Sequence, residues 1–215
     1  MTEDVQRPGA GAFVPVGSSL DGLRAAALGC HGCELYADAT QTVFSKGSPT
    51  ARVALVGEQP GDVEDQRGAP FVGPAGQLLR RALGEAGIEM SSVYLTNAVK
   101  HFKWRRQGKR RLHERPNHEE VMACRLWLDM EIDAVRPAAL VALGATAAGA
   151  LLGPSVRVTK DRGRKLASTL APLVTVTVHP SSILRSADEA SRAHAYEQFV
   201  ADLRRIASWV KSGGG

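Results

Sequence analysis

The 215-residue sequence contains few cysteines, only Cys30, Cys33 and Cys124. So small and odd a number argues against the disulfide framework that stabilises many small secreted proteins. Cys30 and Cys33 form a Cys-X-X-Cys pair, a spacing found in metal sites and also in redox pairs. From this pattern alone, both kinds of site remain open.

The sequence also lacks a long hydrophobic run. Its polar N-terminus is interrupted by Pro8 and has neither the basic start nor the apolar core of a signal peptide. The most apolar stretch, 138–153, is bounded by Pro137 and Pro154 and contains glycines. These features are typical of a buried strand, a turn and a helix rather than a membrane span. We therefore expect a cytoplasmic protein that does not associate with membranes.

Negative charge is scarce in one segment of this basic chain, which has a formal net charge of +5. Between residues 100 and 116 only Glu114 is acidic. The basic residues there are Lys100, Lys103, Arg105, Arg106, Lys109, Arg110, Arg111 and Arg115. A basic loop of this kind attracts phosphates, although a solvated surface loop has the same composition.

Strand-like and helix-like segments alternate along the chain. The predicted strands are 52–56, 93–99, 140–143 and 173–178, and the predicted helices are 20–28, 76–86, 145–152, 187–210 and a long one after Asn117. This alternation predicts a single-domain, three-layer α/β/α fold with a central four-stranded parallel sheet. The domain is expected to span 18–210, with a flexible leader at 1–17, an inserted basic loop at 103–116 and a tail at 211–215. We expect a monomer.

Asn117 is expected to cap the long helix together with Glu120, three residues later. Apolar residues then recur at helical spacing, which predicts a buried helix face. They are Val121, Cys124, Leu128, Ile132 and Val135. A similar capping role, for Ser18 or Ser19, is expected at the helix over 20–28.

Polar residues lie at the carboxyl ends of three of the predicted strands: Glu58, Asn97 and His179. Ligands of parallel sheets bind where the strands end, so these side chains are expected to form one site. Glu58 lies in the motif Gly-Glu-Gln-Pro-Gly-Asp at 57–62, and His179 begins His-Pro-Ser-Ser. A third motif, Pro-Phe-Val-Gly-Pro at 70–74, contains Phe71. Each motif taken singly is also compatible with an ordinary structural turn.

Together with Thr96-Asn97, and in this order, the motifs resemble those of the uracil-DNA glycosylase superfamily over nearly the whole chain, 19–209. The resemblance implies an enzyme that flips uracil out of DNA and cleaves its N-glycosidic bond. The implied uracil-binding residues are Gln59, Asp62, Phe71 and Asn97, the implied catalytic residues include Glu58 and His179, and Arg185 is expected at a phosphate.

The cysteines resemble those of the iron–sulfur branch, or family 4, which holds a 4Fe–4S cluster with four cysteines. One family cysteine lies in a Val-Lys-Cys stretch, which here reads Val99-Lys100-His101. The resemblance therefore implies that His101 completes a ligand set with the three cysteines. A structural zinc site with the same Cys₃His ligands is the alternative, because spacing does not distinguish the two.

A longer segment between His101 and Cys124 contains Lys109-Arg110-Arg111-Leu112-His113. It resembles the Lys-Arg-Arg-Ile-His loop of the X-type subgroup, with leucine in place of isoleucine. The resemblance implies that His113 attacks the sugar and leaves the enzyme bonded to C1′ of the abasic site. Lys109, Arg110 and Arg111 are expected to contact the DNA backbone.

The expected partner is uracil-containing DNA, single-stranded as well as duplex. Two alternative functions remain at this point. In the first, the protein is a hydrolytic uracil-DNA glycosylase with multiple turnovers, and His113 only contacts DNA. In the second, it is not an enzyme and binds single-stranded or abasic DNA through the basic loop.

Overall fold

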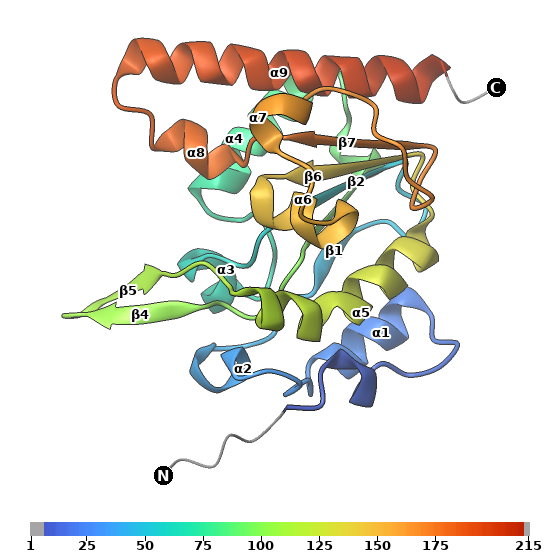
Figure 1. Cartoon of the computed structure of the whole chain (residues 1–215), viewed down its shortest axis with the longest axis vertical. Coiled ribbons are helices and arrows are strands. Elements are labelled where there is room, and N and C mark those ends of the chain that lie inside the picture. Colours follow the sequence, from blue (N-terminus) through green and yellow to red (C-terminus); the bar gives the residue numbers. More distant parts are fainter. Residues whose placement is uncertain (1–6, 213–215) are drawn as a thin grey trace.

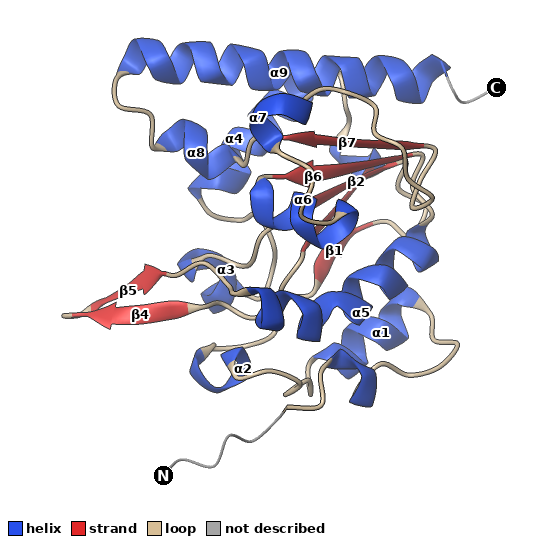
Figure 2. Ribbon diagram, viewed as in Figure 1, coloured by secondary structure: helices blue, strands red, loops and turns tan. Residues whose placement is uncertain are grey.

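The computed structural model describes residues 7–212. Its centre is a five-stranded sheet in the order β1-β3-β2-β6-β7 (Figures 1 and 2). The strands are β1 (Ser45–Gly47), β2 (Val53–Gly57), β3 (Val93–Asn97), β6 (Ala139–Leu143) and β7 (Leu173–Thr177). Strands β2, β3, β6 and β7 pair in parallel, whereas β1 is antiparallel to β3.

The four predicted parallel strands are present, but the sheet has a fifth strand, β1, that was not predicted, and its antiparallel pairing with β3 makes the sheet mixed. Ser45 pairs with Thr96 and Gly47 with Tyr94. With only three residues, Ser-Lys-Gly, β1 has no apolar alternation from which a strand is recognised. A short, polar strand of this kind is typical of a sheet edge.

Helices cover both faces of the sheet. The longer ones are α1 (Leu20–Ala27), α4 (Pro74–Glu85), α5 (His118–Val135), α6 (Ala145–Leu152) and α9 (Glu189–Ser212). The short ones are α2 (Leu35–Asp38), α3 (Asp62–Arg67), α7 (Val158–Asp161) and α8 (Pro180–Leu184), with 3₁₀ turns at Ala10–Ala12 and Met90–Ser92. Figure 1 shows α4 and α9 on one side of the sheet and α1 and α5 on the other.

Alternate residues of each central strand pack into two separate cores. In β2, Val53 and Leu55 pack with α4 and α9. Ala54 and Val56 pack with α1, α5 and α6. This alternation, which follows from the two-residue period of a strand, confirms the predicted three-layer α/β/α fold.

The predicted helix starts are confirmed. Asn117 and Glu120 form a capping box at the start of α5, and the Ser19 hydroxyl accepts a hydrogen bond from Gly22 N at the start of α1. All the residues of α5 that were predicted to face inward are buried, including Cys124. This face directs α5 against the sheet and towards α1.

The inserted basic segment is a two-stranded hairpin rather than a loop. It consists of β4 (Trp104–Gln107) and β5 (Arg110–His113), in which Trp104 pairs with His113. The hairpin projects from the body of the molecule (Figure 2), and Gly108 has a positive φ of 59° in its turn. The short basic sequence has little apolar alternation, which is why periodicity did not reveal it.

The division of the chain into leader, domain and tail stays a prediction. Within the part expected as leader, residues 1–6 lie outside the described residues. Ala10 is buried, and Gly9 N donates a hydrogen bond to Gly32 O at 2.9 Å. At the other end, α9 continues to Ser212 and so includes the start of the expected tail. None of the helices within 7–212 has both the length and the hydropathy that a membrane span requires.

A buried ion pair joins the segment just after β3 to α5. Lys100 is 1% exposed and Glu131 is fully buried, and the ammonium group donates to the Glu131 carboxylate. The same ammonium group donates to Thr96 Oγ1 at 2.7 Å and to Asn97 O at 2.9 Å. Tyr94 also donates to Glu131. The charges are therefore paired, and the backbone at the end of β3 is fixed by the pair.

We predict that Lys100→Met lowers the free energy of unfolding by about 3–5 kcal/mol, because it leaves the Glu131 charge buried without a partner. The double variant Lys100→Met, Glu131→Gln should recover part of this loss, since a neutral amide still accepts from Tyr94 and Thr96. Urea denaturation of both variants tests the prediction. Equal stability of the single and the double variant would contradict it.

Candidate active site

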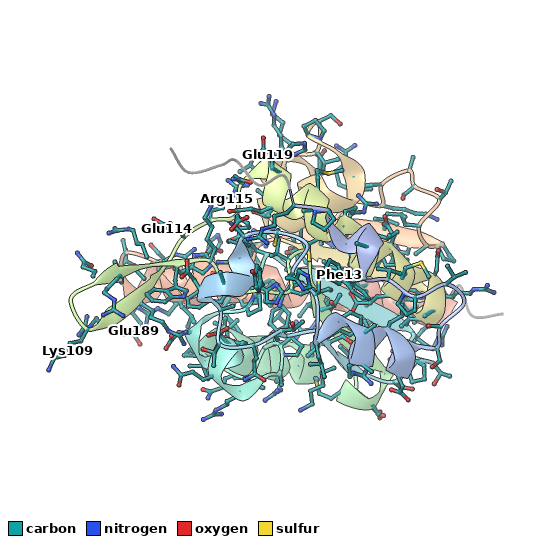
Figure 3. All side chains as sticks on the ribbon, turned by 90° about the horizontal axis from the view of Figure 1, so that it is seen from below. Phe13, Lys109, Glu114, Arg115, Glu119 and Glu189 are labelled. Atoms are coloured by element: carbon teal, nitrogen blue, oxygen red, sulfur yellow. The ribbon has the colours of Figure 1, made fainter. Side chains whose placement is uncertain are left out.

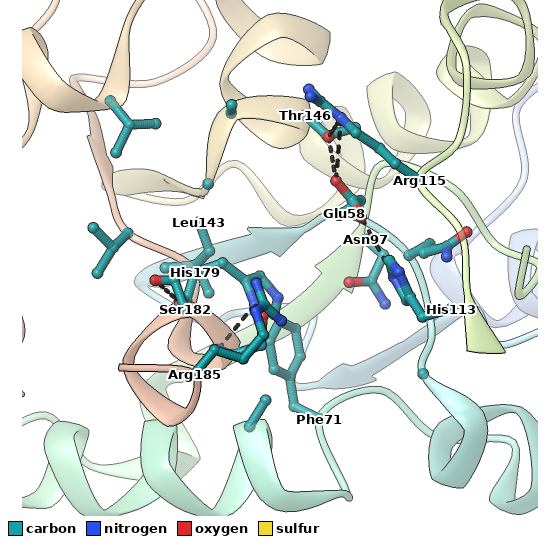
Figure 4. A pocket seen from close by; sticks show the side chains of 18 of the residues that line it. Glu58, Phe71, Asn97, His113, Arg115, Leu143, Thr146, His179, Ser182 and Arg185 are labelled. Carbon is teal, nitrogen blue, oxygen red and sulfur yellow. Dashed lines mark hydrogen bonds and ion pairs between the residues drawn. The ribbon is translucent and has the colours of Figure 1, made fainter. Parts of the chain in front are cut away.

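A cavity of about 840 Å³ lies at the carboxyl edge of the parallel strands (Figure 4). Glu58 follows β2, Asn97 ends β3 and His179 lies just beyond β7, and all three line the cavity. The predicted meeting of these side chains is therefore confirmed. His113 reaches the same cavity from the hairpin.

Glu58 is the most highly connected of these side chains. One carboxylate oxygen, Oε2, accepts a hydrogen bond from the hydroxyl of Thr146 and lies 3.7 Å from Arg115 Nε. The other oxygen, Oε1, lies 3.4 Å from Nε2 of His113. The carboxylate thus has separate partners on its two oxygens.

Asn97 and Phe71 lie together beneath the cavity. Asn97 is 2% exposed and Phe71 is 5% exposed. A Cβ atom at Gly57 would be 2.3 Å from Asn97 Oδ1 and 2.8 Å from Phe71 Cζ, so only glycine permits this approach. Phe71 has a positive φ of 54°, which is uncommon for a bulky residue and indicates a backbone constrained by its surroundings.

His179 is held in one tautomer. Its Nδ1 accepts a hydrogen bond from Ser181 N at 3.2 Å, which caps the start of α8, and lies 2.8 Å from Ser181 Oγ. In a neutral ring, the proton is therefore on Nε2. Burial, together with the charges of Arg185 and His113, lowers the pKa of His179 to about 4. The ring is thus neutral at physiological pH, and it stacks on Phe71 with centroids 6.1 Å apart.

The base of the hairpin is clamped by Gln59. The Gln59 amide nitrogen donates to Glu114 O at 2.8 Å and to Lys103 O at 3.2 Å. Its amide oxygen accepts from Lys103 N at 3.0 Å. Gln59 lines the cavity as expected, but its polar atoms are directed to the hairpin backbone.

Arg111 differs from its expected position at the DNA backbone. It donates to Asp62 and to the buried Asp65, each at 2.6 Å, and its side chain is only 20% exposed. Its guanidinium also lies over the rings of Phe102 and Trp104. Arg111 therefore fixes the hairpin to α3. Asp62, expected at the uracil, is part of this anchor and is not among the residues that line the cavity.

The other residues expected at phosphates are placed differently. Lys109 and Arg110 are exposed, and Lys109 lies at the tip of the hairpin (Figure 3). Arg185 lines the cavity on the side of α8. These three side chains are accessible to a polyanion, unlike Arg111.

The sequence of the whole chain is similar to that of known proteins. The Uracil DNA glycosylase superfamily matches residues 44–204. The chain belongs to this superfamily. A type-4 uracil-DNA glycosylase of Thermotoga maritima is 37% identical over 186 residues, which cover 86% of this chain and 91% of the relative. One from Pyrobaculum aerophilum, also type-4, is 35% identical over 73% of this chain and 80% of its own.

A type-5 uracil-DNA glycosylase of Pyrobaculum aerophilum matches more narrowly, with 37% identity over 49% of this chain and 50% of its own. The broad matches are therefore to the type-4 branch, whose cysteines those of this chain resemble. The X-type hairpin sequence is a finer feature than these names describe.

In this superfamily member, the three cysteines are free: Cys30 and Cys33 lie in the segment between α1 and α2, and Cys124 lies in α5. Cys33 and Cys124 are buried, and burial raises the pKa of the Cys124 thiol to about 12. Trp127 Nε1 lies 3.3 Å from Cys30 Sγ, and His101 Nε2 lies 3.0 Å from Thr42 Oγ1.

This set of thiols and an imidazole is suited to an iron–sulfur cluster or to zinc. Within 7–212, however, no group of three or more histidine, cysteine or acidic side chains converges closely enough to hold a metal ion. The thiols and the imidazole are suitable ligands for a cluster or for zinc, and their assignment as ligands remains a prediction.

Sequence reasoning missed Thr146 and the local roles of Arg115 and Ser181. Thr146 is the second residue of α6, directly beyond β6. Since β6 is parallel to its neighbours, the rule that identified the other strand ends would have led to it. Arg115 was counted only as a basic residue, because nothing local indicates that it approaches Glu58.

We predict that Arg111→Ala accelerates amide hydrogen exchange throughout β4 and β5, because the hairpin loses its ion pairs to Asp62 and Asp65. Arg110→Ala is the matched control, since the neighbouring Arg110 is exposed. Exchange followed by mass spectrometry should separate the two variants. Equal exchange in both would show that the ion pairs do not hold the hairpin.

A second prediction concerns the pH dependence of stability. The pKa of His179 is about 4 in the folded protein, below the ordinary value of 6.5. The unfolded chain therefore binds more protons between these pH values, and His179 lowers the free energy of unfolding as the pH falls from 6.5 to 4. His179→Asn, which retains a capping side chain, should make the dependence flatter. The free energies of unfolding of the two proteins are measured by urea denaturation at several pH values between 4 and 6.5. An equal dependence on pH in both would contradict the prediction.

Proposed function

We propose that this superfamily member excises uracil from DNA and then remains covalently linked through His113 to C1′ of the abasic site. The observation that carries the proposal is the 3.4 Å distance between His113 Nε2 and Glu58 Oε1 at the cavity edge. The named activity of the type-4 relatives supports uracil excision. The resemblance of 109–113 to the X-type loop supports the covalent outcome.

Recognition of the base is assigned to Asn97 and Phe71. The side-chain amide has an NH₂ group that donates to O4 of uracil and an oxygen that accepts from N3–H, whereas cytosine reverses this pattern. The ring of Phe71 provides a face on which the flipped base stacks. The rigid approach of both residues at Gly57 supports a preformed pocket.

Cleavage is assigned to His179 and Glu58. As the C1′–N1 bond breaks, its electron pair leaves with uracil, and the sugar becomes positively charged. Nε2–H of the neutral His179 ring donates a hydrogen bond to uracil O2 and stabilises the developing negative charge. The Glu58 carboxylate stabilises the positive sugar.

His113 then takes the place of water. An imidazole nitrogen donates its lone pair to C1′ and forms the new N–C bond. The imidazole loses the N–H proton of its other nitrogen, and the departing uracil anion takes up one proton. Proximity supplies much of the rate, because the hairpin holds the ring beside the cavity. The bond between the imidazole nitrogen and C1′ is not readily broken, so each protein molecule reacts once.

The hydrolytic alternative rests on the exposure of His113, whose side chain is 49% exposed. In that case water attacks the sugar, and the enzyme turns over. The binding alternative rests on the exposed Lys109 and Arg110 alone. DNA binding alone does not require Glu58, Asn97 and His179 to meet at one cavity, so the geometry favours an enzyme.

The prediction is that excess uracil-containing DNA, single-stranded or duplex, releases uracil in an amount equal to the protein. A species that survives boiling in SDS should form at the same time, and thymine-containing DNA should not form it. Many equivalents of uracil would support the hydrolytic alternative, and no uracil would support the binding alternative.

His113→Ala should abolish the covalent species while retaining most of the DNA binding, and Glu58→Gln should suppress both uracil release and the covalent species. Lys109→Ala is the matched control in the same hairpin and should still form the adduct. Mass spectrometry after digestion should locate the adduct on the peptide that contains His113. An adduct on another residue would refute the assignment.

For the cofactor, we propose a 4Fe–4S cluster held by Cys30, Cys33, His101 and Cys124. When bound, such a cluster would supply structural cross-linking, because glycosidic cleavage requires no electron transfer. The ligand positions connect the α1–α2 segment, the start of the hairpin segment and α5. Ligation would therefore hold the two ends of the segment that carries His113.

Purified protein is accordingly expected to be brown and to contain iron and sulfide in similar amounts. Cys124→Ser should lose the colour and lower the thermal midpoint, because metal binding is coupled to folding. Colorimetric iron and sulfide assays with thermal denaturation test this. Colourless protein with stoichiometric zinc after anaerobic purification would favour the zinc alternative.

A further inference from the structure

A chain of three hydrogen-bonding side chains ends at Glu58. Arg115 Nε donates to Thr146 Oγ1 at 2.9 Å, and the Thr146 hydroxyl donates to Glu58 Oε2. A guanidinium can only donate, and a hydroxyl has a single proton. The direction of the chain is therefore fixed from Arg115 through Thr146 to Glu58.

Thr146 is the rigid member of this chain. Its side chain is buried, at 7% exposure, and it belongs to α6, which packs against the sheet. The preceding turn is constrained at Gly144, which has a φ of 89° and where a Cβ would lie 3.1 Å from His179 Cβ. Arg115, in contrast, is 65% exposed. Thr146 thus supplies a fixed donor, and Arg115 polarises its hydroxyl from the solvent side.

The two oxygens of Glu58 are consequently not equivalent. Oε2 is engaged by the Thr146 hydroxyl, so rotation of the carboxylate is restricted. Oε1 is left to face His113 at 3.4 Å. Without the bond to Thr146, Oε2 keeps only the longer, 3.7 Å contact with the exposed Arg115, so the carboxylate is less firmly held towards His113.

We propose that Thr146 is a positioning residue that holds Glu58 with Oε1 towards His113 and thereby determines whether His113 or water captures the sugar. This inference rests on the covalent reaction proposed above. The role is distinct from that of Glu58, since Thr146 acts only through the carboxylate.

Valine and serine at position 146 form a matched pair for a test. Thr146→Val keeps the shape of the side chain but removes the hydroxyl, whereas Thr146→Ser keeps the hydroxyl. Each variant is mixed with uracil-containing single-stranded DNA, and free uracil, covalent adduct and alkali-labile abasic DNA are measured over time. Thermal midpoints establish that each protein is folded.

Thr146→Val should release uracil about tenfold more slowly or worse, the usual effect of losing a hydrogen bond to a charged group. The ratio of covalent adduct to released uracil should also fall in this variant. Free abasic DNA should account for the rest of the released uracil. Thr146→Ser should remain within about threefold of the unchanged protein. A simple loss of structural stability would not change the share of adduct per uracil released.

Arg115→Gln provides a test that does not alter the core, since this side chain is exposed. Its effect and that of Thr146→Val should be less than additive in the double variant, because both side chains act on the same oxygen, Glu58 Oε2. If Thr146→Val is folded and forms adduct with unchanged rate and share, the inference is wrong. It is equally wrong if Thr146→Ser is as impaired as Thr146→Val. If Thr146→Val does not fold, Thr146→Ala takes its place, and a normal rate and share of adduct in that folded variant overturns the inference.

Failure of the covalent proposal is recognised separately. In that case the unchanged protein forms no adduct and releases many equivalents of uracil. The rates of uracil release then decide the role of Thr146, because Glu58 still stabilises the sugar cation. Slow release by the valine variant with normal release by the serine variant retains the positioning role, and equal rates in both remove it.

Discussion

The parallel pairing of β2 with β3 and β6 is the constraint on which the site depends. Gly57 pairs with Asn97, so the ends of β2 and β3 coincide, and β6 and β7 end at the same edge. Side chains that follow these strands must therefore meet, although they are distant in sequence. The absence of a Cβ at Gly57 then permits Asn97 and Phe71 to approach.

Several charged side chains of this protein form ion pairs that stabilise its structure. The buried pair of Lys100 and Glu131 fixes the backbone that carries Asn97, and Arg111 anchors the hairpin through Asp62 and Asp65. Two of the basic residues counted between 100 and 116 are thus unavailable to phosphate. Accessible positive charge lies in the outer part of the hairpin, with Lys109 and Arg110, and at the cavity, with Arg185.

Much of the fold was predictable because its signals are local. Apolar runs located the four parallel strands, and Asn117 with Glu120 located the start of α5. The strand ends also identified Glu58 and Asn97 without knowledge of the structure. What remained hidden depends on distant partners. Nothing near Arg111 in sequence indicates that it pairs with Asp65. The three residues Ser-Lys-Gly do not indicate an edge strand either.

The position of His113 was found from its motif, but only the fold gives it a chemical context. Glu58 is the carboxylate that stabilises a positive sugar in the proposed reaction, and it is also the group that would orient an attacking water. His113 Nε2 lies 3.4 Å from the oxygen suited to that task. The histidine and the water would therefore compete for one position. Gln59 clamps the base of the hairpin beside this position, which favours the side chain already held there over a water that must enter.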